Sequence, residues 1–205
     1  MLNVKTLLFR VCKNTTYLLK KKNITENLFP VKETKLIFTF HFKLKICLKM
    51  KDELSLLHHA ISLAKKSIRD GGGPFGAVIA RDGKIIAEAN NMVVTSHDPT
   101  AHAEILAIRK ASAALRSHDL SDCVIYASCE PCPMCLGAIY WSGIKRVVYA
   151  AGRKDAADAG FNDSLIYDEI ILNPSERKVA FIKESNAGGK EVFKEWDKYE
   201  GKIPY

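Results

Sequence analysis

The chain has 205 residues, of which 47% are hydrophobic and 26% charged, so it is long enough for one well-buried domain but not for two. Its formal net charge of +8 suggests an anionic partner such as nucleic acid. The charge is unevenly placed: residues 1–49 hold 11 of the 31 Lys and Arg and 2 of the 23 Asp and Glu. Residues 50–205 therefore hold 20 basic and 21 acidic residues, a net charge of −1 that argues against a polyanion-binding body.

The first 49 residues differ from the rest in composition, because they contain no Gly or Ala and show no sustained helical or strand period. They lack the apolar core and cleavage site of a signal peptide, and the apolar stretch 36–42 is far short of the roughly 20 residues that a membrane span needs. We expect residues 1–49 to be a basic extension outside the fold, with translation beginning at Met50. A basic targeting peptide or an arm for an anionic surface is the alternative. We accordingly expect a cytoplasmic protein with no membrane partner.

From Met50 onward the apolar spacing and the turn residues predict alternating helices and strands in one domain, residues 50–205. An amphipathic helix ends before the glycines at 71–73, which we interpret as a turn because they follow a helix and precede a strand, unlike a phosphate-binding loop. A two-stranded hairpin turns at Asp82-Gly83. The later elements are a helix over 102–116, a strand over 123–128, a helix from Pro131 to Trp141, a strand over 146–151, helices at 164–170 and 191–199, and a strand over 178–184.

This alternation of strands and helices predicts the fold class. Two strand–helix–strand passages in succession favour a sheet with parallel pairing and helices on its faces, an α/β layered domain.

Three of the six cysteines lie within the stretch SCEPCPMCLGAIYW, residues 128–141. Cys132 and Cys135 have the spacing that lets two thiolates bind one zinc ion, and Pro131 and Pro133 place them at a helix N-terminus, where the thiolate form is favoured. His102 also stands at a predicted helix start. One imidazole and two thiolates would give the three protein ligands that a catalytic zinc commonly has.

Glu104 follows His102 by two residues, a spacing that does not put two ligands side by side on a helix, so we expect it to act as an acid/base beside the metal. Two alternatives remain open. Cys129 could join the other three ligands in a closed structural Cys3His site, or Cys132 and Cys135 could be a redox pair that does not need the histidine.

His102-Ala103-Glu104 followed by Pro131-Cys132-Pro133-Met134-Cys135 resembles the signature of the zinc-dependent nucleobase deaminases, in which His, Cys and Cys hold zinc and the Glu moves protons. Further stretches across residues 50–205 resemble the bacterial guanine deaminases: GGPFGAVI, HDPTAHAEILAIRKA, DAADAGFNDSLIYDEI and the closing IPY. The resemblance implies a cytidine deaminase-like layered domain, with a central mixed sheet and helices on both faces.

The same resemblance implies a Zn²⁺-dependent hydrolysis of guanine to xanthine and ammonia, in which Glu104 and Asp163 are catalytic. Asp163 would contact the guanine edge. The other substrate contacts that it implies are Asn91, the backbone at Ala103, Phe75, Trp141, Phe161 and Tyr205. Ordinary core packing is the alternative for the aromatic residues.

Quaternary structure and substrate choice also follow from the resemblance. Enzymes of this kind form homodimers that exchange their C-terminal segments, which would bring Tyr205 to the partner's pocket. Guanosine deaminase and tRNA adenosine deaminase are the alternatives to guanine deaminase as the function. The neutral body makes nucleic acid an unexpected partner, although a local patch such as Lys145-Arg146 with Arg153-Lys154 could exist within it.

Overall fold

The computed structural model describes residues 31–185 and 187–204, with side chains described from residue 50 onward. Its contacts divide the chain into two units, residues 1–58 and 59–205. The described part of the first unit is helical and belongs to α2 (Val31–Arg69). Tyr205, expected at the substrate pocket, lies outside the described residues, as do residues 1–30 of the expected basic extension. Residues 31–49 of that extension are helical and continue without a break into residues 50–69.

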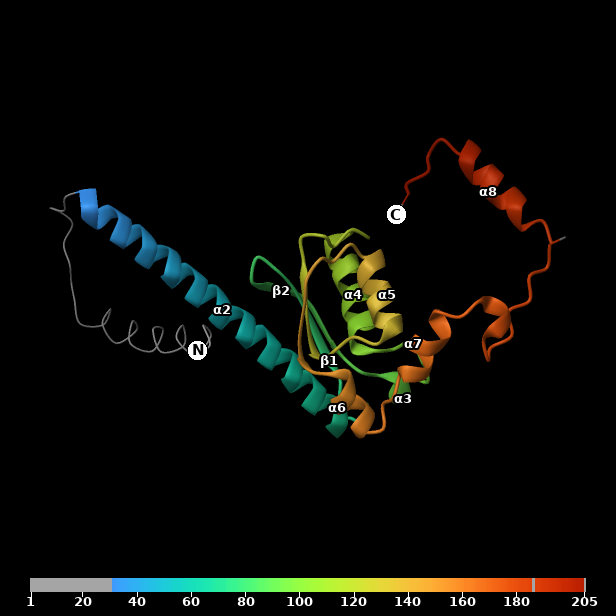
Figure 1. The fold of residues 1–205 in the computed structure, drawn as a ribbon, viewed down its shortest axis with the longest axis horizontal. Coiled ribbons are helices and arrows are strands. Elements are labelled where there is room, and N and C mark those ends of the chain that lie inside the picture. Colours follow the sequence, from blue (N-terminus) through green and yellow to red (C-terminus); the bar gives the residue numbers. More distant parts are fainter. Residues whose placement is uncertain (1–30, 186, 205) are drawn as a thin grey trace. The chain divides into compact units, whose positions relative to one another are not determined.

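The second unit contains a four-stranded sheet in the order β2-β1-β3-β4. The strands are β1 (Gly76–Arg81), β2 (Lys84–Asn90), β3 (Val124–Cys129) and β4 (Val147–Ala151). β1 pairs antiparallel with β2 and β3, whereas β3 and β4 are parallel. The expectation of an α/β fold with a mixed sheet is therefore confirmed (Figure 1).

The predicted hairpin between β1 and β2 is confirmed, and its turn explains the choice of residues. Asp82 and Gly83 both have positive φ angles, 51° and 77°. This is the backbone that a two-residue type I′ turn requires, and Asp-Gly adopts it readily. The turn pairs Arg81 with Lys84 and sets the register of both strands.

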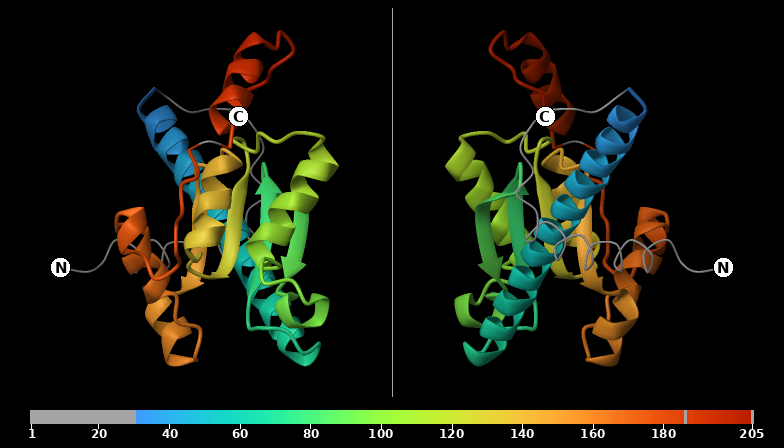
Figure 2. Two further views of the ribbon diagram at one scale, coloured as in Figure 1. Left: turned by 90° about the vertical axis from the view of Figure 1, so that its right-hand side faces the viewer. Right: turned by 90° about the vertical axis from the view of Figure 1, so that its left-hand side faces the viewer.

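Helices cover both faces of the sheet (Figure 2). The side chains of β1 alternate between the two faces and are buried on both. Ala77 and Ile79 share a buried cluster with Ala103 and Ala107 of α4 (Ala103–Leu115). On the other face, a Cβ at Gly76 would lie 2.3 Å from the carbonyl oxygen of Ala60 in α2. Only glycine permits this close packing of β1 against the helix.

The remaining helices have ten residues or fewer, and α5 and α8 are the longest of them. They are α3 (Val93–Ser96), α5 (Pro133–Trp141), α6 (Arg153–Asp158), α7 (Ser164–Ile170), a 3-10 turn (Pro174–Glu176) and α8 (Gly189–Lys198). The predicted helices over 102–116, 131–141, 164–170 and 191–199 are all found, with small shifts of their ends.

One predicted element is wrong. Residues 178–184 form no strand, and their apolar side chains are exposed, with Ile182 89% accessible. Alternating apolar residues produce a strand only where a neighbouring strand accepts the backbone hydrogen bonds. Among the described residues of this single chain, no strand pairs with the segment.

Candidate zinc-dependent active site

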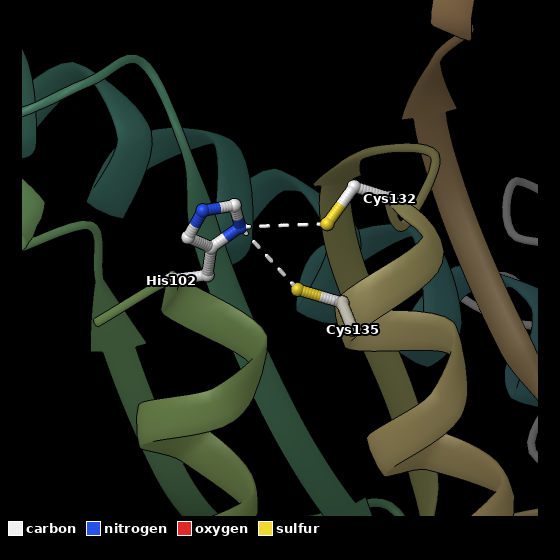
Figure 3. A group of neighbouring side chains, drawn as sticks. All are labelled: His102, Cys132 and Cys135. Atoms are coloured by element: carbon white, nitrogen blue, oxygen red, sulfur yellow. Dashed lines mark hydrogen bonds between the residues drawn. The ribbon is translucent and has the colours of Figure 1, made fainter. Parts of the chain in front are cut away.

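Two helix N-termini bring the three expected ligands together (Figure 3). His102 is the N-cap residue of α4, and Cys132 is the N-cap residue of α5, which opens with Pro133 at its first position. A proline there costs no hydrogen bond, because the first amides of a helix have no partner within it. Cys135 lies one turn into α5 and is fully buried.

The distances between these side chains fit a tetrahedral zinc ion. His102 Nδ1 lies 3.6 Å from Cys132 Sγ and 3.5 Å from Cys135 Sγ. Tetrahedral bonds of about 2.05 Å to nitrogen and about 2.3 Å to sulfur would separate two such ligands by about 3.6 Å. Among the residues whose side chains are described, these three form the group whose donor atoms all lie within 4.8 Å of one another.

Cys129 does not belong to this group. Its Sγ lies 3.7 Å from the carbonyl oxygen of Gly152, to which it donates. Burial raises the pKa of the Cys129 thiol. The site thus offers three protein ligands, and a fourth position is available for water, as in catalytic zinc sites.

The electrostatics of the two cysteines show why a cation suits the site. A hydrogen bond from Cys135, followed by one from His102, lowers the pKa of Cys132 to about 4. Donating this hydrogen bond to Cys132 raises the pKa of Cys135. In the same way, the hydrogen bond that His102 donates to Cys132 raises the pKa of His102. A divalent cation held by these three ligands would keep both sulfurs as thiolates.

Glu104 lies in the first turn of α4 and is 6% exposed. Desolvation raises the pKa of its carboxyl group, and the Cys132 charge acts in the same direction. A raised carboxyl pKa suits a group that must both accept and donate protons near neutral pH. Its oxygens are not part of the three-ligand group, in accord with a role beside the metal.

A family model for the cytidine and deoxycytidylate deaminase zinc-binding region matches residues 50–151. The chain is 51% identical to a Bacillus subtilis guanine deaminase over 152 residues, which cover 74% of this chain and 97% of the relative. The chain belongs to the cytidine and deoxycytidylate deaminase family. It is a zinc-binding deaminase, with His102, Cys132 and Cys135 positioned to hold the ion.

Solved structures of family members agree with the fold. The X-ray structure of the Bacillus subtilis guanine deaminase matches with a TM-score of 0.72 over 74% of this chain and 97% of that one. A Bacillus subtilis tRNA-specific adenosine deaminase is a further relative, 37% identical over 139 residues, which cover 68% of this chain and 85% of the relative. The family thus includes relatives whose names refer to a free base and to tRNA.

The structure brings some of the expected substrate residues together. The rings of Phe75 and Phe161 meet edge to face, with centroids 4.9 Å apart. Asn91 is buried, and its Oδ1 accepts the backbone N–H groups of Gly73 and Val93 at 3.3 and 3.2 Å. These two bonds fix the side-chain amide and leave its NH2 group available to another acceptor.

Trp141 lies elsewhere in this chain. It ends α5, about 13 Å along the helix from Cys132, and is 70% exposed. There it lines a surface pocket with Ser112, Arg116 and His118.

The sequence prediction missed a cluster around Asp163, which occupies the N-cap position of α7. Arg153, interpreted from sequence as part of a possible basic surface patch, lies with its guanidinium carbon 3.7 Å from the centre of the Tyr167 ring. Its Nε lies 3.7 Å from Asp163 Oδ1. Gly152 follows the end of β4. No sequence pattern reveals that the Arg153 side chain stacks on Tyr167, whereas Lys154 is exposed and pairs with Asp158.

Proposed function

We propose that this chain hydrolyses guanine to xanthine and ammonia. The observation that carries the proposal is the 51% identity to a guanine deaminase over 97% of that relative's length. The buried Glu104 beside a three-ligand metal site supplies the chemistry that such a reaction needs.

In this reaction Glu104 is the group that moves protons. A zinc ion held by His102, Cys132 and Cys135 would lower the pKa of water toward neutrality. Glu104 takes the proton of the attacking water and delivers it to a ring nitrogen. It then takes the proton of the new C2 hydroxyl and passes it to the amine, so that the C2–N bond breaks, ammonia leaves and the C2 carbonyl of xanthine forms. Its burial supports this role, because a raised pKa lets one carboxyl group act first as base and then as acid.

The purine is held by polar and aromatic side chains around this centre. Asn91, whose Oδ1 is already occupied, donates from its NH2 group to the ring, and the backbone at Ala103 adds a further hydrogen bond. Phe75 and Phe161 form an apolar wall, and their mutual contact supports this arrangement. Asp163 contacts the guanine edge and assists proton transfer.

The enzyme acts as a homodimer that exchanges C-terminal segments. The apolar side chains of α8 support this, because Val192, Phe193 and Trp196 share one helix face and are 64%, 73% and 42% exposed. A helix with such a face normally buries it against a partner. In the dimer the C-terminal segment, with Tyr205, covers the partner's pocket.

Within residues 31–185 and 187–204, no helix has the length and apolar character to cross a membrane. Residues 1–49 lie outside the catalytic fold in this proposal, and the family match likewise begins at residue 50.

A tRNA substrate is the second candidate, because several relatives of this chain are tRNA deaminases. Guanosine is the third. Ammonia release from guanine, guanosine, adenine, cytosine and tRNA, measured side by side on the zinc-loaded enzyme, separates them. Guanine should be the preferred substrate, and deletion of residues 1–49 should leave its turnover unchanged. A preference for tRNA that is lost on this deletion or at raised salt would contradict the proposal.

A further inference from the structure

We propose that Arg153 is a positioning residue for Asp163, and that it fixes the carboxylate that contacts the guanine edge. The inference rests on the proposed function, which gives Asp163 its contact with the purine. It is carried by the contacts of Arg153, whose backbone and side chain are both held in place beside the zinc-binding segment.

The backbone of Arg153 is fixed at the junction of two strand ends. Its N–H donates to Glu130 Oε2 at 3.3 Å. Glu130 follows β3, and its own N–H donates to the carbonyl oxygen of Ala151 at 2.9 Å. Since Glu130 lies two residues before Cys132, the start of α6 is tied directly to the segment that carries two of the zinc ligands.

The side chain of Arg153 is fixed by an aromatic stack. Its guanidinium carbon lies 3.7 Å from the centre of the Tyr167 ring, a distance at which a planar cation is attracted to the ring face. Arg153 Nε is shielded from solvent and has no hydrogen-bond partner in the described part of the chain. Asp163 Oδ1 lies 3.7 Å from that atom.

Asp163 is not used to stabilise its own helix. It occupies the N-cap position of α7 without a side-chain capping bond, and the N–H of Ser164 is taken by Asn162 Oδ1 at 2.9 Å. The Asp163 side chain is 21% exposed and the Arg153 side chain is 41% exposed, so the pair is partly shielded on the side of the carboxylate. Contact of Arg153 with Oδ1 leaves Oδ2 to accept an N–H from the purine.

A double-mutant cycle tests this assignment. Arg153→Gln removes the charge and retains a polar side chain, and Asp163→Asn removes the carboxylate. If Arg153 acts through Asp163, Arg153→Gln should lower kcat/KM for guanine about tenfold in the wild-type enzyme, mainly through KM, and less than twofold in the Asp163→Asn background. Zinc content should be unchanged, and Arg153→Lys should recover part of the loss.

A binding measurement gives a second readout that does not depend on turnover. In the Glu104→Gln background guanine stays intact, so its Kd can be measured by calorimetry. Adding Arg153→Gln should weaken binding about tenfold. The matched control is Lys154→Gln, which removes an equal charge from the next residue of the same helix and should leave both Kd and kcat/KM unchanged, because Lys154 is exposed.

Two results would overturn the assignment. One is that the losses of kcat/KM from Arg153→Gln and Asp163→Asn multiply in the double variant. The other is that Arg153→Gln changes neither KM nor Kd. If Arg153→Gln does not fold, Tyr167→Leu replaces it in the same cycle, since it removes the stack that holds the guanidinium. If the wild-type enzyme releases no ammonia from guanine, the proposed function fails by itself. The cycle is then run on the purine that the substrate panel identifies.

Discussion

Replacement of Glu104 by Gln should abolish most of the turnover while leaving the zinc site intact. The two side chains have nearly the same shape, but the amide cannot take a proton from water. A positioned acid/base contributes about 10²- to 10⁴-fold, or about 2.7–5.5 kcal/mol of activation free energy. Glu104 is 6% exposed, so bulk water has little access to replace it, and the loss should lie toward the larger figure.

The same substitution makes a prediction about stability with a defined sign. Burial raises the pKa of Glu104 in the folded state above its unfolded value, so its ionisation disfavours folding as pH rises above the unfolded pKa. Gln carries no such cost. In metal-stripped protein, the melting temperature of Glu104→Gln should therefore match wild type near pH 4 and equal or exceed it at pH 8.

Three measurements on the purified variant decide the matter: ammonia release from guanine, zinc content by atomic absorption, and melting temperature against pH. Turnover within tenfold of wild type would refute the assignment of Glu104 as proton carrier. Loss of zinc would show that Glu104 is a ligand, contrary to its absence from the three-donor group. A variant less stable than wild type at pH 8 would refute the sign of the pKa argument.

Three further outcomes are expected. Cys135→Ser should lose most of its bound zinc, whereas Cys129→Ser should keep it; equal losses by atomic absorption would favour a closed four-ligand site. Gly76→Ala would place a Cβ 2.3 Å from a backbone oxygen of α2 and should lower the free energy of unfolding, measured by urea denaturation, by about 1–3 kcal/mol. Gly137→Ala is the control: its Cβ would meet no atom within 4 Å, so the free energy of unfolding should not fall. The hydrogen bond from Arg81 of β1 lowers the pKa of Asp122, so the stability that Asp122 contributes is present above the unfolded pKa and is lost as pH falls through the lowered pKa. Asp122→Asn should slightly lower the melting temperature at pH 7, and this difference should shrink as the pH falls through that range.

The sequence determined the metal-binding residues, because the ligands stand where local chemistry reveals them. Prolines mark the start of α5 and place Cys132 and Cys135 at a helix N-terminus, and the Asp-Gly turn defines the β1–β2 hairpin. Each of these signals depends on backbone preferences within a few residues. Such preferences do not need the rest of the fold.

The tertiary structure decided what depends on distant partners. Residues 178–184 have a strand-like pattern but form no strand, because no neighbouring strand accepts their hydrogen bonds among the described residues. Trp141 shares the helix of Cys132 yet lies at its other end. Arg153 and Lys154 are adjacent cations in the sequence. Of the two, Arg153 stacks on the Tyr167 ring and lies beside the largely shielded carboxylate of Asp163, and both of these residues come from a segment that begins ten residues further along the chain. Composition identifies a cation, but only packing determines whether it lies on the surface or beside the site.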